Sequence, residues 1–82
     1  MGTPTVVRCV TTWTTEYIAT VTPIASGGWV AEVTMADPCY GPDEGYEVAV
    51  LARALTRTAR EAERLARRML RRALEEYEEE DA

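Results

Sequence analysis

The sequence predicts an α+β fold in which a small antiparallel sheet carries one long C-terminal amphipathic helix on one face. Two stretches with period-two alternation of apolar residues come first, a Ser26-Gly27-Gly28 turn separates them, and a run with helical spacing ends the chain. With 82 residues the chain is one domain, residues 1–82, and buries only about 60–65% of its unfolded surface. We expect three strands, or four if the first stretch is divided.

Residues 5–22 have the composition of a strand. Val7, Cys9 and Tyr17 stand at odd positions with other apolar residues, whereas threonine and charged residues dominate the even positions. This alternation predicts a half-buried strand with the odd positions on its apolar face. No turn residue interrupts the stretch, so one strand and two strands both remain open. Pro23 ends it, because proline cannot donate to a sheet ladder.

The second predicted strand covers residues 29–35 and follows the glycine turn, where positive φ angles are needed. Its apolar residues share one face: Trp29, Ala31, Val33 and Met35. Residues 37–45 contain two Pro, two Gly and two Asp, which predicts a loop.

Residues 46–55 fit two structures. As a strand, the segment places alternate apolar residues on one face: Tyr46, Val48, Val50, Ala52 and Ala54. As a helix, it places a different set on one stripe: Val48, Leu51, Ala52, Leu55 and Ala59. We favour the strand, because two valines and the preceding Gly45 are weak helix formers.

Residues 59–77 show the clearest pattern, an apolar stripe at three- and four-residue spacing that predicts an amphipathic helix packed on the sheet. The stripe consists of Ala62, Leu65, Ala66, Met69, Leu70, Ala73, Leu74 and Tyr77. Thr58 with Glu61 forms a capping-box signature that places the helix start near Ala59. Residues 78–82 form an acidic tail. We expect Trp29 or Trp13 to contact the stripe.

The composition argues against catalysis. There is no His, so no nucleophile–base pair can be built with it, and two Cys cannot complete a four-ligand metal site. We expect Glu16 and Glu32 on the strands, and Asp37 just after the second strand, to be solvated carboxylates. We therefore expect no enzyme activity, no catalytic residues, no metal and no cofactor.

The N-terminus lacks the features of a signal peptide, and no apolar run is long enough to span a membrane. We therefore expect a cytoplasmic protein that does not enter the membrane. In that compartment Cys9 and Cys39 would be free thiols.

The net charge of −5 hides a strongly uneven distribution. Residues 59–74 carry six Arg against two Glu, and residues 75–82 carry six acids. Like charges four residues apart and acids at a helix C-terminus both destabilise an isolated helix, although Glu63–Arg67, Arg71–Glu75 and Arg72–Glu76 offset part of this. Either this is a solvated charged face, or it meets a partner. The candidate partner-binding residues are Arg60, Arg64, Arg67, Arg68, Arg71, Arg72, Glu75, Glu76, Glu78, Glu79 and Glu80.

Two segments resemble HicB-like antitoxin domains. Residues 17–35 are similar to the opening hairpin of that family, and residues 58–70 are similar to its helix, with a Thr cap followed by Glu-Ala and recurring Ala. The resemblance implies a strand-strand-strand-helix fold, a partial ribonuclease-H-like sheet without that enzyme's active site, and toxin neutralisation by binding. Residues 1–15 have no counterpart, Asp37-Pro38-Cys39 match a family segment poorly, and residues 40–47 look like an insertion.

We therefore expect an antitoxin-like, non-catalytic protein-binding module that acts stoichiometrically on a basic toxin or a host protein. One alternative is a small phage or mobile-element protein that binds a host protein or forms a structural homo-oligomer. A further alternative is an RNA-binding module that uses the arginines, although the net charge, the lack of Lys and the acidic tail argue against nucleic acid. We also expect a homodimer through a sheet edge or the N-terminal strand.

Overall fold

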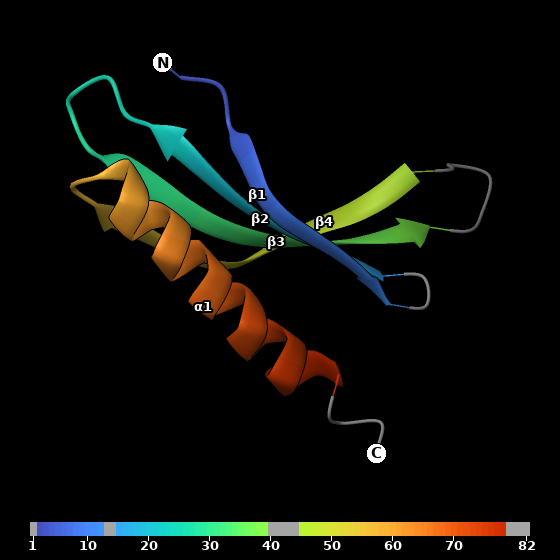
Figure 1. The fold of residues 1–82 in the computed structure, drawn as a ribbon. Helices are drawn as coiled ribbons and strands as arrows, with labels where there is room; N and C mark the ends of the chain where they lie inside the picture. Colours follow the sequence, from blue (N-terminus) through green and yellow to red (C-terminus); the bar gives the residue numbers. More distant parts are fainter. Residues whose placement is uncertain (1, 13–14, 40–44, 79–82) are drawn as a thin grey trace.

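The structure, a computed structural model, has four antiparallel strands and one helix that lies across one face of the sheet (Figure 1). It describes residues 2–12, 15–39 and 45–78, and only the backbone of residues 38–39, 45–47 and 78. The elements are β1 (Thr5–Thr12), β2 (Thr15–Pro23), β3 (Trp29–Cys39), β4 (Gly45–Thr56) and α1 (Ala59–Glu78). The strands lie in the order β1-β2-β3-β4. The predicted α+β fold is thus confirmed, with the first stretch divided into two strands.

The core lies between α1 and the two central strands, β2 and β3. Its buried residues in the described part of the chain are Tyr17, Ala19, Val21, Ala31, Val33, Ala62, Ala66, Leu70 and Ala73. Five of these nine are alanine, so the core contains little side-chain volume. Trp29, Leu65 and Met69 are partly buried and pack against this core, whereas Trp13 lies outside the described residues. The helix stripe therefore packs on the sheet as predicted.

A bulge in β1 changes which of its residues face the core. The pairing with β2 shifts between Val6 and Arg8, and beyond the shift the alternation is reversed. Val7 and Val10 both pack against the core, while Cys9 is exposed on the opposite face. The prediction that Cys9 shares an apolar face with Val7 is therefore wrong, because one extra residue on a bulged strand turns the following side chains over.

A second bulge divides β4, which is a strand as favoured from the sequence. Val50 pairs with Thr34 and Ala52 pairs with Val33, so Leu51 is the extra residue. Val48 and Val50 consequently face away from the helix, whereas Ala52 lies on the helix side. The single face predicted for residues 46–54 is therefore wrong, for the same reason as in β1.

Strand β3 is longer than predicted and includes Asp37, Pro38 and Cys39, which we had assigned to a loop. Pairing with β2 ends at Ala36, so beyond that residue β3 has β4 as its partner on one side. Pro38 is compatible with such an edge position, because its missing N–H can point away from the ladder. Residues 40–44 of the predicted loop lie outside the described residues.

Backbone conformation and local contacts define the β2–β3 turn and the start of α1. Gly27 and Gly28 have φ angles of 97° and 99°, as a tight turn with left-handed residues requires. A Cβ on Gly28 would lie 2.9 Å from the carbonyl oxygen of Thr56. At the helix, the backbone N–H of Glu61 donates to Thr58 Oγ1 at 3.2 Å, which confirms the predicted cap.

Candidate functional site

The helix covers β2 and β3 more fully than β4, and two hollows open between β4 and α1. The larger, of about 680 Å³, lies at the C-terminal half of α1 and is lined by Leu51, Ala52, Met69, Arg72, Ala73, Glu75, Glu76 and Tyr77. The smaller, of about 290 Å³, lies near the helix start and is lined by Leu55, Thr56, Glu61, Arg64, Leu65 and Arg68. We call the two hollows together the β4 seam.

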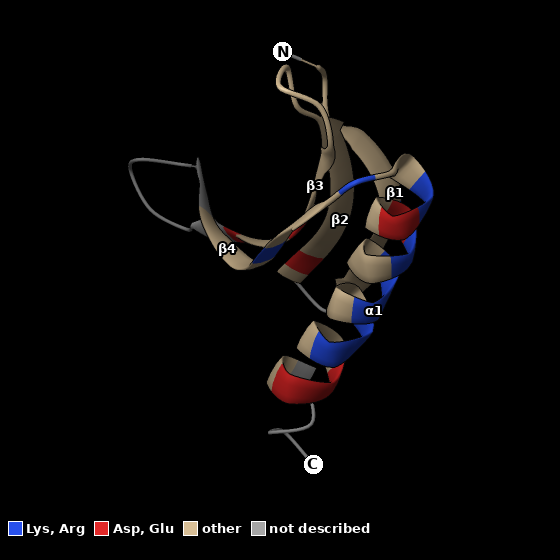
Figure 2. Cartoon of the chain, turned by 90° about the vertical axis from the view of Figure 1, so that its left-hand side faces the viewer, with Lys and Arg blue, Asp and Glu red and all other residues tan. Residues whose placement is uncertain are grey.

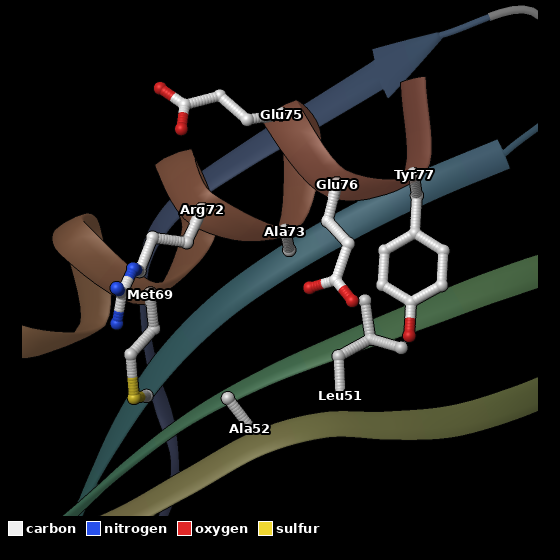
Figure 3. Close-up of a pocket in the computed structure, with 8 residues that line it drawn as sticks. All are labelled: Leu51, Ala52, Met69, Arg72, Ala73, Glu75, Glu76 and Tyr77. Atoms are coloured by element: carbon white, nitrogen blue, oxygen red, sulfur yellow. The ribbon is translucent and has the colours of Figure 1, made fainter. Parts of the chain in front are cut away.

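The larger hollow has an apolar floor and a charged rim (Figure 3). Met69 extends from α1 toward Ala52, and the ring of Tyr77 stands beside Leu51. Glu76 points toward the strands, whereas Glu75 points away from them. Tyr77 is 43% exposed, so its ring is open to a partner. This combination resembles the centre of a protein–protein interface, where an apolar anchor is surrounded by polar groups.

The six helix arginines fall into two rows. Arg64, Arg68 and Arg72 follow one another at four-residue spacing, and all three line the β4 seam. This spacing keeps them on one side of the helix, because an α-helix has 3.6 residues per turn. The other three, Arg60, Arg67 and Arg71, line neither hollow. Figure 2 shows where these basic residues occur along α1, between acidic residues near its two ends.

These arginines are exposed, and none of them forms a close ion pair within the described residues. The contacts expected between Glu63 and Arg67, and between Arg71 and Glu75, are therefore not formed. The ion pair that the structure shows joins Arg53 to Glu32 at 2.6 Å, on the sheet face away from the helix. The guanidinium groups of α1 are consequently available to a partner.

The acidic candidates divide in a similar way. Glu75 and Glu76 are exposed and line the larger hollow with Arg72. Glu78 ends α1, and only its backbone is described. Glu79 and Glu80 lie outside the described residues, so the structure places neither of them.

The carboxylates on the strands have partners within the protein. Glu16 accepts a hydrogen bond from Cys9 Sγ at 3.3 Å, and Asp37 accepts one from Thr15 Oγ1. Partial desolvation, together with the nearby Glu16 carboxylate, raises the pKa of the Cys9 thiol above its ordinary value.

Over residues 2–12, 15–39 and 45–78 no three His, Cys, Asp or Glu side chains gather as metal ligands would. No helix in the same residues is long and apolar enough to cross a membrane.

Sequence reasoning missed the apolar half of the β4 seam. Met69 and Tyr77 belong to the helical stripe and were expected to pack on the sheet, and Leu51 was expected on the side opposite Ala52. The apolar stripe shows which helix residues face the sheet, but it does not show which strand, if any, lies opposite each of them. The stripe is wide and continues to Tyr77. This width is the sequence signal that could have suggested that the helix has more apolar surface than β2 and β3 cover.

Comparison of the chain with known protein families, with curated proteins and with solved structures finds no match.

Proposed function

We propose that this protein is a non-catalytic module that binds another protein stoichiometrically through the β4 seam. An apolar side chain of the partner would occupy the floor beside Leu51 and Met69. Acidic side chains next to it would meet Arg64, Arg68 and Arg72. The observation that carries the proposal is the row of unpaired arginines directly beside an open apolar hollow.

Each half of this surface supplies a different part of the binding free energy. Burial of an apolar side chain in a hollow that excludes water is the usual source of affinity at an interface. Arginine binds carboxylates in a planar, bidentate geometry, which adds orientation and raises the association rate. A segment with acids on both sides of a Leu or Trp therefore fits the seam.

The charges of the seam favour an acidic protein over nucleic acid. Glu61 and Glu76 share the hollows with the arginines, and a phosphate chain laid along the helix would approach them. The chain as a whole carries a net charge of −5, which opposes a polyanion at long range. A partner peptide can place its few acids at the arginines and avoid the glutamates.

The proposal shares stoichiometric protein binding with the antitoxin-like function implied by the HicB-like resemblance. It differs in the partner, since the described surface is basic and suits an acidic segment instead of a basic toxin. Neutralisation of a toxin stays a narrower proposal, tied to residues 78–82 at the acidic end of the chain.

The test is fluorescence anisotropy with labelled twelve-residue peptides and the full-length chain. The probe carries a central Leu or Trp flanked by Asp and Glu; a second peptide replaces the apolar residue with Ser, and an RNA oligonucleotide of equal charge is compared. We expect the first peptide to bind most tightly. We expect binding to weaken as NaCl is raised from about 0.05 to 0.3 M, because charge attraction is screened.

Two triple variants form a matched pair, since each removes three arginines from the same exposed helix. Arg64→Ala with Arg68→Ala and Arg72→Ala should weaken peptide binding by about tenfold or more. Arg60→Ala with Arg67→Ala and Arg71→Ala should weaken it by less than about threefold. Equal losses in both variants, or tighter binding of RNA than of the peptide, would contradict the proposal.

A further inference from the structure

The sheet face opposite the helix carries mainly aliphatic and threonine side chains, and no element in the described part of the chain covers it (Figure 2). Three of its aliphatic side chains are more than half exposed: Val6, Val48 and Val50. Ile18 and Val30 lie on the same face of the central strands, at positions that alternate with buried residues. We call this surface the far face.

We propose that a second copy of this chain covers the far face, so that two sheets pack against each other with the two helices on the outside. A two-fold interface brings the same patch of both copies together and must therefore be complementary to itself. A sheet face of aliphatic and threonine side chains meets that requirement, and face-to-face packing of two sheets is a common arrangement of antiparallel strands.

The exposed area of the chain is larger than a compact monomer requires. The chain exposes 6085 Å², whereas a compact monomer of its mass, 9.1 kDa, exposes about 4,900 Å². Its radius of gyration is 13.8 Å, against about 12 Å for a compact domain of this length. The far face and the β4 seam are both uncovered surfaces among the described residues.

The far face is wide enough for a stable interface. Four strands about 4.8 Å apart, each paired over roughly eight residues of 3.3 Å, give a face of on the order of 500 Å² in projection. Side chains increase the accessible area above this projection, so two copies would together bury more than about 1,000 Å², the lower bound for a specific interface.

The charges on the far face permit the approach of an identical surface. On the described residues of β2, β3 and β4 they are Glu16, Glu32 and Arg53. Glu32 and Arg53 neutralise each other at 2.6 Å. The remaining neighbours are threonines and aliphatic residues, for example Thr20 and Thr34. Repulsion between two copies thus comes from Glu16, which lies at the start of β2, and from the net charge of −5, and both contributions are screened by salt.

Sedimentation velocity of the full-length chain tests the proposal, over about 1 to 200 µM protein. We expect a monomer–dimer equilibrium that shifts toward dimer between about 0.05 and 0.5 M NaCl, since screening removes repulsion and salt strengthens apolar association. Salt should therefore strengthen dimerisation, whereas it should weaken peptide binding at the β4 seam. Because the two salt dependences are opposite, failure of one proposal can be distinguished from failure of the other.

Substitutions on the far face identify the surface. The double variant Thr20→Lys with Val50→Lys places two charges on this face and leaves the backbone edges intact; it should weaken dimerisation by about a hundredfold or more. The control Ala25→Lys adds a lysine to the exposed β2–β3 turn and should dimerise like the unsubstituted chain. Val50→Thr keeps the shape of the side chain and its preference for strands, and should weaken dimerisation about threefold to tenfold.

Three results would overturn the proposal. The first is a monomer at every concentration and salt level. The second is a dimer that both far-face variants leave unchanged, which would indicate pairing through the edge of β1 or β4. The third is equal weakening by Ala25→Lys. Circular dichroism establishes whether each variant is folded. If the lysine variant is not folded, the dimerisation of the Val50→Thr variant decides whether the far face is the interface.

Discussion

The two faces of the sheet come from the same alternating strands, yet they present different chemistry. The helix side holds an alanine-rich core in its centre and opens only beside β4, where charged side chains surround an apolar floor. The far face is uncovered, carries aliphatic and threonine side chains, and includes the ion pair between Glu32 and Arg53. In this two-layer domain the helix covers one face of the sheet, and under the proposal above a second copy of the chain would cover the other.

The largest expected difference between the faces is in the free energy of unfolding. Leu70 is 2% exposed on the helix side, so Leu70→Ala should lower that free energy by about 2–5 kcal/mol through lost burial and the cavity left behind. Val48 is 66% exposed on the far face, so Val48→Ala should change it by less than about 1 kcal/mol. Urea denaturation followed by circular dichroism measures both.

The comparison is made at low protein concentration, where the proposed dimer would dissociate and Val48 would have no partner. A rise in the cost of Val48→Ala with protein concentration would support the far-face dimer. Equal costs for Leu70→Ala and Val48→Ala in the monomer would instead break the distinction between a covered and an uncovered face.

The covered face also depends on where α1 begins, and Thr58 sets that point. Removal of its hydroxyl in Thr58→Ala leaves the N–H of Glu61 without its 3.2 Å acceptor and should cost about 1 kcal/mol of stability. Thr58→Ser keeps the acceptor and should cost only a few tenths of a kcal/mol. Thermal unfolding of the two variants gives the comparison, and equal losses would mean that the hydroxyl does not cap the helix.

The smallest expected effect is chemical and concerns Cys9 on the far face. Its pKa is raised, so a smaller fraction is thiolate at a pH of about 8 and alkylation is slow, because the thiolate is the nucleophile. Glu16→Gln removes the neighbouring carboxylate charge, lowers the pKa of the thiol and should increase the alkylation rate. The measurement uses a Cys39→Ser background, so that one thiol reacts. An unchanged rate would show that Glu16 does not influence Cys9.

The sequence indicated most of the elements, but it left the division between β1 and β2 open, ended β3 too early and did not show the faces of β1 and β4. Helical spacing identified α1, Pro23 marked the end of β2, and the Gly27-Gly28 turn marked the start of β3. Period-two alternation, however, assumes that no residue is added to a strand. One extra residue before Val10 and one at Leu51 reverse the side chains that follow, so a single period-two pattern cannot describe either strand.

The candidate site was predictable only in its charges. The arginines of α1 stand out in the sequence and the structure leaves them exposed, but their division into two rows depends on where β4 lies beside the helix. That placement results from the bulge at Leu51 and from the packing of α1 on β2 and β3. Both are tertiary effects, so Arg64, Arg68 and Arg72 could not be separated from Arg60, Arg67 and Arg71 beforehand.

The strand order has a consequence for how the chain folds. Each strand pairs with its neighbour in the sequence, so the sheet can grow hairpin by hairpin with short loops to close, which favours fast folding. The helix is the last of the five elements. During synthesis the four strands therefore leave the ribosome before α1, and the side chains of Tyr17, Val21 and Val33 stay exposed until it arrives. Unpaired strands with apolar faces are prone to aggregate at this stage, and rapid docking of the arginine-rich α1 would shorten it.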